Sequence, residues 1–376
     1  HNYFIIENNT INGKTPNKVT TAMAISKGLR IRPGIKGCTP GTRLARMQAS
    51  PNHQEGKFVN SIPTNAYQDG YMLHIIKNKL LGNYIASPPS KIPIKPLQPE
   101  FFKTMPLSGL RAIWFGHSSV LIEIDGIRLL VDPVFSKVVS PVSFLGPKRF
   151  HPPPIALTDL PKIDAVIISH DHLDHLDKTT TQYLAAKGTF FLVPLGIGAY
   201  LKKWMIREGQ FIELDWWESS KVGQVRLICT PARHYSGRSL FDWNRTLWSS
   251  WAIIGTKQRV FSSGDTGYSD HFQEIGRRFG PFDLTLMKVG SYDPFWPDVH
   301  LNPEQATNAH LDVCGQHLLP VHWSTYDLSL HDWDEPIKRT VKAAKQKDIK
   351  LFTPHIGEAI EFGQPFSSSR WWEKIK

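Results

Sequence analysis

Cysteine is scarce in this chain. Only Cys38, Cys229 and Cys314 occur among 376 residues, and none of them forms a Cys-x-x-Cys pair. Closely spaced cysteines in even number would have indicated a disulfide framework or a thiolate metal site. Neither is expected here, so a metal site in this chain must be built from histidine and carboxylate side chains.

Long apolar runs are also missing. No segment reaches the roughly 18 apolar residues that a membrane-spanning helix requires. The pattern His-x-Lys-x-x-x-x-Asp is absent too, so a phosphohistidine nucleophile of that kind is not expected. Because the sequence begins with His1 rather than Met, a removed targeting segment stays an open alternative, and the compartment is undetermined.

Positive charge is concentrated near the N-terminus. The formal net charge is +11, and residues 1–100 hold 13 Lys and Arg against 4 Asp and Glu, which accounts for +9 of it. A basic solvated segment is one interpretation. Attraction to an anionic surface, either lipid headgroups or nucleic acid, is the other.

Three segments precede the first clear strand. Residues 1–60 are polar and rich in Gly, Pro, Thr and Asn, which predicts an irregular arm. The apolar run at 71–76 predicts a short helix that ends near residue 79, and proline-rich residues 86–106 predict a connector. The apolar side of the helix either packs on the core or contacts lipid or a partner, and we assign three of its residues to substrate or membrane contact: Tyr71, Leu73 and Ile75.

From residue 110 onward, apolar strand patterns alternate with helical ones. Several of these strands end in His or Asp, which is the arrangement that an open α/β metal site requires. We therefore expect two β-rich layers with helices outside, over residues 106–376, after an extension of residues 1–105. The predicted strands are 111–115, 120–124, 128–131, 165–168, 190–193, 224–230, 249–254, 258–262, 284–289 and 316–321, and the predicted helices are 179–187 and 303–311.

The densest chemical signal is the sequence SHDHLDH at 169–175, directly after the strand predicted at 165–168. Its pattern His-x-His-x-Asp-His places three imidazoles and a carboxylate within six residues, and zinc prefers such ligands. The spacing suits two metals rather than one. The alternative, four solvated polar loop residues, becomes weak because other strand ends supply the missing ligands.

Three further residues at strand ends complete a set of seven: His234, Asp265 and His322. Alone, each of these histidines would more often be an ordinary core or surface residue. We assign one metal to His170, His172 and His234 and the other to Asp174, His175 and His322. Asp265 bridges them, and a shared hydroxide formed at neutral pH is the expected nucleophile.

Two more histidines lie near the same expected rim. His117 follows the first strand and is either a hydrogen-bond partner of the site or a structural turn residue, and we favour the structural role. His300 precedes the helix predicted at 303–311. It either caps that helix or faces the substrate, where it could bind a phosphoryl oxygen or assist the leaving group.

The sequence resembles a known family, the N-acyl-phosphatidylethanolamine-hydrolysing phospholipase D family of the metallo-β-lactamase fold superfamily. The resemblance runs from about residue 58 to residue 358, while roughly the first 55 residues show no match. It is specific because motifs unrelated to metal binding match in order. These motifs are DPVFS at 132–136, GPKRF at 146–150, ELDWWE at 213–218, EIGRRFGPFD at 274–283, HLNPEQA at 300–306 and HWSTY at 322–326.

The resemblance implies an αββα sandwich of α/β class, two Zn²⁺ per chain, and cleavage of a phospholipid to phosphatidic acid and an N-acylethanolamine. The family's substrate-contacting histidine matches His300, but the glutamine that precedes it in the family is Val299 here. The family's metal ligands match the same seven residues: His170, His172, Asp174, His175, His234, Asp265 and His322.

The leading hypothesis is a peripheral membrane phospholipase D of the zinc type, with catalytic roles for Asp174, Asp265 and His300. Its expected partners are a phospholipid substrate and an anionic membrane surface. We expect no specific nucleic-acid partner, and a homodimer is one assembly that the sequence allows. Two alternatives stay open: another hydrolase of this fold, acting on a lactone or a nucleic-acid phosphodiester, and a non-catalytic metal-bearing membrane protein. Iron or manganese could replace part of the zinc.

Overall fold

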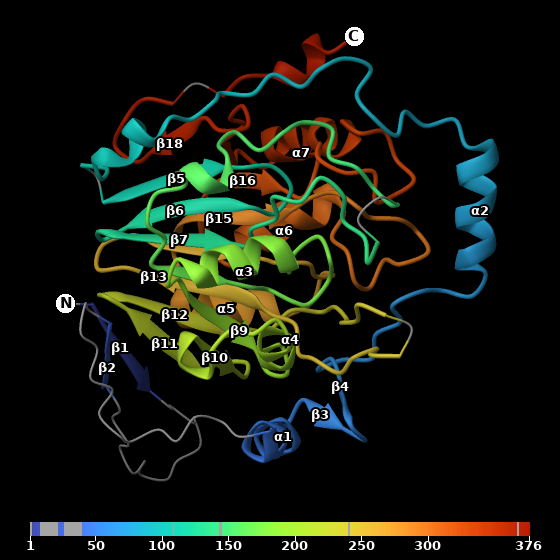
Figure 1. The fold of residues 1–376 in the computed structure, drawn as a ribbon. Helices are drawn as coiled ribbons and strands as arrows, with labels where there is room; N and C mark the ends of the chain where they lie inside the picture. Colours follow the sequence, from blue (N-terminus) through green and yellow to red (C-terminus); the bar gives the residue numbers. More distant parts are fainter. Residues whose placement is uncertain are drawn as a thin grey trace.

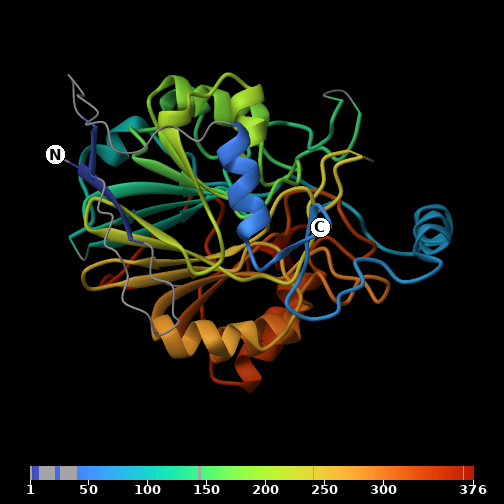
Figure 2. The ribbon, with the colours of Figure 1, turned by 90° about the horizontal axis from the view of Figure 1, so that it is seen from below.

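Two β-sheets pack face to face between two groups of helices (Figure 1). This computed structural model describes residues 2–7, 22–25, 40–107, 109–142, 145–239, 241–366 and 368–376. Figure 2 shows the layers edge-on, with green helices on one side of the sheets and orange to red helices on the other. The predicted αββα sandwich is therefore confirmed.

The first sheet has seven strands in the order β10-β9-β8-β7-β6-β5-β18. The strands from β5 to β7 form an antiparallel meander, and β8 to β10 continue from β7 in parallel. Almost all of their residues are buried, which explains the continuous apolar runs in the sequence. The strands are β5 (Leu110–Trp114), β6 (Val120–Ile124), β7 (Ile127–Val131), β8 (Ala165–Ile167), β9 (Phe190–Pro194), β10 (Phe211–Leu214) and β18 (Ala359–Glu361).

The second sheet has nine strands in the order β17-β16-β15-β14-β13-β12-β11-β1-β2. Strands β14 to β17 are parallel, so their carboxyl ends lie at one edge of the sheet. The strands are β1 (Asn2–Glu7), β2 (Ala22–Ile25), β11 (Ser219–Val222), β12 (Val225–Thr230), β13 (Ser250–Ile254), β14 (Arg259–Ser262), β15 (Phe282–Lys288), β16 (Gly315–Val321) and β17 (Lys350–Leu351).

Helices cover the outer face of each sheet (Figure 2). The first sheet is covered by α3 (Lys178–Ala186) and α4 (Gly198–Lys203), and the second by α5 (His271–Phe279), α6 (Pro303–Asp312) and α7 (Glu335–Gln346). The start of α6 is fixed by a capping box, in which Asn302 accepts from the backbone N–H of Gln305 and the Gln305 side chain accepts in return.

Every strand and helix predicted from residue 110 onward is present, with ends that differ by no more than two residues. In the same region, the sequence patterns missed β10, β11, β17, β18, α4, α5 and α7. Strand β11 was missed because it is polar although buried: Ser219 and Ser220 are each 2% exposed. Periodicity of apolar residues therefore gave no signal there.

Residues 1–60 were predicted to be irregular, but part of this region forms regular elements. Besides β1 and β2, this part contains α1 (Pro40–Ala49), β3 (His53–Gln54) and β4 (Lys57–Phe58). Two basic side chains of α1 contact acidic residues of the core: Arg43 pairs with Glu213, and Arg46 pairs with Glu218. Composition could not reveal these ion pairs, because the partners lie far away in the sequence. The division at residue 105 stays a prediction.

The helix predicted near residue 71 is present as α2 (Tyr71–Leu81). It stands away from the body of the molecule in both views, and none of its residues is buried (Figures 1 and 2). The proline-rich connector contains one 3₁₀ turn, η1 (Pro99–Lys103). Within the described part of the chain, no helix has the length and apolar character needed to cross a bilayer.

The Arg43–Glu213 pair yields a stability prediction. Both side chains are buried, so Arg43→Met would leave the Glu213 carboxylate without its cation. We expect this to lower the free energy of unfolding by about 3 kcal/mol in urea denaturation. The matched control is Arg46→Met, whose side chain is 38% exposed in its pair with Glu218 and whose loss should cost about 1 kcal/mol or less. Equal losses for both variants would contradict this role of Arg43.

Candidate metal centre

All seven predicted ligands meet at one edge of the two sheets. Residues 170–175 follow β8 of the first sheet, and the others follow β12, β14 and β16 of the second. Among the described residues, four groups of His and Asp have ligand atoms within 4.8 Å of one another, and together they contain all seven. Strands from both sheets therefore deliver their terminal residues to a common site.

One cluster consists of three histidines. Nε2 of His170 lies 2.9 Å from Nδ1 of His172, and Nε2 of His234 lies 3.3 Å from the same atom. Burial and the neighbouring histidines lower the pKa of His170 and of His234 well below the ordinary value. Neutral imidazoles whose nitrogens converge in this way are suited to a divalent cation.

The second cluster is built around Asp174. Its Oδ2 lies 3.4 Å from Nε2 of His175 and 3.5 Å from Nε2 of His322. Burial would raise the pKa of Asp174, but the surrounding histidines outweigh it and hold that pKa well below the ordinary value. The carboxylate is therefore ionised and able to bind a metal.

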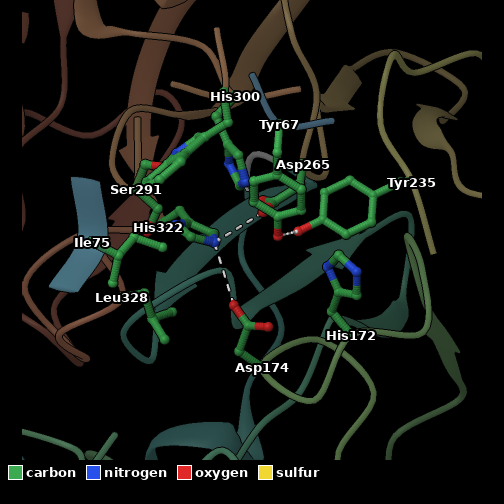
Figure 3. Close-up of a pocket in the computed structure, with 11 residues that line it drawn as sticks. Tyr67, Ile75, His172, Asp174, Tyr235, Asp265, Ser291, His300, His322 and Leu328 are labelled. Carbon is green, nitrogen blue, oxygen red and sulfur yellow. Dashed lines mark hydrogen bonds and ion pairs between the residues drawn. The ribbon is translucent and has the colours of Figure 1, made fainter. Parts of the chain in front are cut away.

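Asp265 is shared between the clusters. Its Oδ1 lies 3.4 Å from Nε2 of His175, and its Oδ2 lies 3.2 Å from Nε2 of His322 (Figure 3). It also belongs to a group with His170 and to another with His234. The bridging role of Asp265 stays a prediction.

The fit to metal ions rests on unpartnered polar atoms. Four buried atoms of this site have no hydrogen-bond partner among the described residues: His175 Nε2, Asp265 Oδ1, His300 Nδ1 and His322 Nε2. Buried polar groups are rarely left unsatisfied, because each costs free energy when it loses water. Cations in the two clusters would satisfy the atoms of the predicted ligands.

We expected a structural role for His117, but its ring is a hydrogen-bond partner of the site. Its Nε2 lies 2.8 Å from Oδ2 of Asp174, and its ring centroid lies 3.9 Å from that of His322. Burial is the main reason that its pKa falls to about 3, so the ring is neutral. It donates a hydrogen bond that orients Asp174. In the sequence, only its position after a strand at the same expected rim indicated this role.

Asp132 holds His175 in place, a role that its position in the sequence did not indicate. Its Oδ2 accepts from Nδ1 of His175 at 2.8 Å and from Oγ of Ser169 at 2.6 Å, while Oδ1 accepts from the Ser169 N–H at 2.7 Å. These bonds turn Nε2 of His175 toward the metal cluster. Such partners fix the tautomer and orientation of a metal-binding histidine. In the sequence, an Asp-Pro pair after β7 indicates only that the strand ends.

Lys288 is a second group that the sequence did not reveal. It is fully buried at the end of β15, and its Nζ donates to the carbonyl oxygen of Gly290. Burial lowers its pKa to about 8, although the nearby carboxylates of Asp265 and Asp174 act in the opposite direction. It adds positive charge close to the shared carboxylate.

The predicted metal ligands open into a cavity of about 210 Å³. Figure 3 shows that its walls differ in character, with His and Asp side chains facing tyrosine rings and apolar side chains. The lining residues are Tyr67, Ile75, His172, Asp174, Tyr235, Asp265, Ser291, Trp296, His300, His322 and Leu328.

The predicted substrate contacts lie in different places. His300 and Ile75 line the cavity. Tyr71 lies behind it, stacked on Tyr67 with a centroid distance of 4.3 Å, and Leu73 is 71% exposed on α2. Because Asn302 caps α6, the capping alternative for His300 is excluded.

Val299 occupies the position where the resembled family has glutamine. Its side chain is fully buried, and its backbone carbonyl accepts from Nδ1 of His234 at 2.9 Å. It therefore helps to orient a predicted metal ligand through its backbone, while its side chain makes no polar contact.

Comparison with known proteins identifies the class. A β-lactamase superfamily domain matches residues 127–323, and the chain belongs to the metallo-β-lactamase superfamily, with the fold of a metal-dependent hydrolase. A solved structure, Igni18 from Ignicoccus hospitalis, titled a metallo hydrolase, superposes with a TM-score of 0.53 at 22% identity, covering 68% of this chain and 99% of that one.

Two curated relatives are more similar in sequence. An uncharacterized protein of Mycobacterium tuberculosis (strain H37Rv) is 42% identical over 351 residues, which cover 92% of this chain and 94% of the relative. N-acyl-phosphatidylethanolamine-hydrolyzing phospholipase D 1 of Caenorhabditis elegans is 38% identical over 275 residues, which cover 68% of this chain and 76% of that protein.

The Asp132–His175 bond predicts an effect on metal affinity. Asp132→Asn would present an N–H group where Ser169 and His175 both require an acceptor. We expect zinc affinity to fall by about 10- to 100-fold in a chelator competition assay. The control is Asp159→Asn, an exposed aspartate, and it should bind zinc as the native protein does. Native affinity in Asp132→Asn would contradict an orienting role.

Proposed function

We propose that this protein is a zinc-dependent phospholipase D that hydrolyses N-acyl-phosphatidylethanolamine to phosphatidic acid and an N-acylethanolamine. The observation that carries the proposal is a cavity lined both by predicted metal ligands and by apolar and aromatic side chains. Such a cavity suits a substrate with a phosphodiester next to hydrocarbon. The name and extent of the Caenorhabditis elegans relative support the same substrate class.

The reaction replaces one P–O bond with another. The oxygen of a water molecule bonds to phosphorus, the bond from phosphorus to the N-acylethanolamine oxygen breaks, and that oxygen takes up a proton. Two zinc ions held by the seven ligands would lower the pKa of the water and neutralise charge on the phosphoryl oxygens. His175, Asp174 and Asp265 are held in place for this purpose by Asp132, His117 and the histidines around them.

His300 has a binding role in this scheme. Its Nδ1 lies 3.6 Å from Oδ2 of Asp265, and the residue lines the cavity. Burial, together with the charge of Lys288, lowers its pKa well below the ordinary value. A neutral imidazole is a poor acid at neutral pH but can still donate one hydrogen bond, so His300 orients a phosphoryl oxygen.

Helix α2 supports a peripheral position on a membrane. One of its residues, Ile75, lines the cavity, while a row of apolar side chains projects outward. Lys77 adds positive charge, whereas Lys79 pairs with Asp327 at 2.7 Å. Exposed apolar patches with basic residues favour anionic lipid surfaces. The outward side chains and their exposed fractions are Met72 (54%), Leu73 (71%), Ile76 (49%), Leu80 (77%) and Leu81 (78%).

The direct test is hydrolysis of N-acyl-phosphatidylethanolamine in mixed micelles, with metal content measured on the same sample. We expect release of N-acylethanolamine by protein that carries about two zinc ions per chain, loss of release after chelation, and recovery when zinc is restored. Two bound zinc ions without release would reject this substrate and favour another ester or diester.

A second test concerns α2. Leu73 and Leu80 are seven residues apart and share a face of the helix. Because both are exposed, Leu73→Glu combined with Leu80→Glu should leave folding intact but weaken binding to anionic phospholipid vesicles about tenfold or more. Hydrolysis of a short-chain soluble analogue should not change. The control is Leu311→Glu, a half-exposed leucine of α6 on the outer layer. Equal vesicle binding by both proteins would reject α2 as the docking element.

A further inference from the structure

Two tyrosine hydroxyl groups meet in the cavity beside the metal ligands. The phenolic oxygens of Tyr67 and Tyr235 lie 2.6 Å apart, and both residues line the cavity. Figure 3 shows the two rings turned with their hydroxyl groups toward each other, close to His172 and Asp265. Tyr67 comes from the segment before α2, and Tyr235 directly follows His234.

Packing fixes both rings. Tyr67 stacks on Tyr71 at a centroid distance of 4.3 Å, and Tyr235 stacks on Trp243 at 4.6 Å. Tyr235 also meets His172 edge-on, with ring centroids 4.7 Å apart. The hydroxyl groups are therefore positioned beside the three-histidine cluster before any ligand arrives.

The pair of hydroxyl groups has one hydrogen that it can donate to a ligand. Two phenols carry two hydroxyl hydrogens, and the bond between them uses one. Within the described part of the chain, neither oxygen has another hydrogen-bond partner. The second hydrogen is thus available to a ligand in the cavity, and a phenol whose oxygen already accepts a bond is a stronger donor.

The residues that line the cavity indicate which kind of ligand group needs this hydrogen-bond donor. No lysine or arginine is among the described residues that line it. A phosphodiester bound there would have to satisfy its non-bridging oxygens through metal ions and neutral donors. The tyrosine pair and His300 are the donors best placed for this, since Ser291 Oγ already lies 3.3 Å from Nδ1 of His322.

We propose that Tyr67 and Tyr235 form an oxyanion site that binds one non-bridging phosphoryl oxygen next to the three-histidine cluster. The proposal rests on the proposed function, because it assigns a phosphodiester to the same cavity. It also gives the N-terminal extension a direct part in binding, since Tyr67 belongs to that extension. A phosphoryl group could come from a phospholipid or from free phosphate, and the same donor serves both.

The test uses Tyr67→Phe, Tyr235→Phe and the double variant, with Tyr183→Phe on the outer helix α3 as the control. Phenylalanine keeps each ring stack and removes only the hydroxyl group. Binding of inorganic phosphate to the zinc-loaded proteins is measured by isothermal titration calorimetry, after zinc content and melting temperature have been shown to be native.

We expect the double variant to bind phosphate about tenfold more weakly or worse, because it loses a hydrogen bond to a charged ligand. Each single variant should lose less, since the remaining hydroxyl group still donates, and Tyr183→Phe should bind as the native protein does. Native phosphate affinity in the double variant, with zinc content unchanged, would overturn the proposal.

Hydrolysis of N-acyl-phosphatidylethanolamine by the same proteins separates the two proposals. A parallel loss of phosphate binding and of kcat/KM in the double variant supports the site for a lipid phosphodiester. If native protein binds phosphate through the tyrosines but releases no N-acylethanolamine, the oxyanion site stands and the proposed function fails. If native protein hydrolyses the lipid and the double variant keeps both properties, the oxyanion site fails and the proposed function stands.

Discussion

The buried carboxylate of Asp265 is the constraint on which the site depends. It is 3% exposed and lies between His175 and His322, which come from different sheets. The turn that carries it has no space for larger residues: a Cβ at Gly264 would lie 2.7 Å from Cβ of Ser169, and one at Gly267 would lie 1.8 Å from a backbone oxygen. Close packing of this turn thus holds the carboxylate against the residues that follow β8.

The same turn also connects Asp265 to the three-histidine cluster. Thr266 Oγ1 accepts from the backbone N–H of Arg233 at 2.9 Å, and the Gly267 N–H donates to the Arg233 carbonyl at 2.8 Å. His234 follows directly, so the distance between the shared carboxylate and this histidine is set by backbone hydrogen bonds. The two clusters are therefore parts of one rigid arrangement rather than two independent sites.

Residues of the N-terminal extension complete the lining of the cavity. Strand ends supply the predicted metal ligands, but Tyr67 and Ile75, which also line the cavity, lie before β5 in the extension. Their position depends on α2, because Tyr71 at its first turn stacks on Tyr67. The helix that carries the exposed apolar row is thus in physical contact with the cavity wall, which links the proposed lipid surface to the proposed site of hydrolysis.

The sequence predicted the sandwich and its ligands because both leave local signals. Buried strands are continuous apolar runs, and residues 170–175 combine three histidines and two aspartates. The roles of Asp132 and the tyrosine pair left no such signal. An Asp-Pro after a strand has the appearance of a chain turn, and Tyr67 and Tyr235 are 168 positions apart. Helix α1 was not predicted, because its arginines pair with glutamates of β10 and of the turn after β10. Only the folded chain brings these residues close to one another.

The most direct test of the account is a crystal structure of the zinc-loaded protein with anomalous diffraction recorded at the zinc edge. We predict two peaks, one among His170, His172 and His234 and one among Asp174, His175 and His322, with Asp265 within bonding distance of both. A single peak, or two peaks that do not share Asp265, would contradict a dinuclear centre organised by this carboxylate.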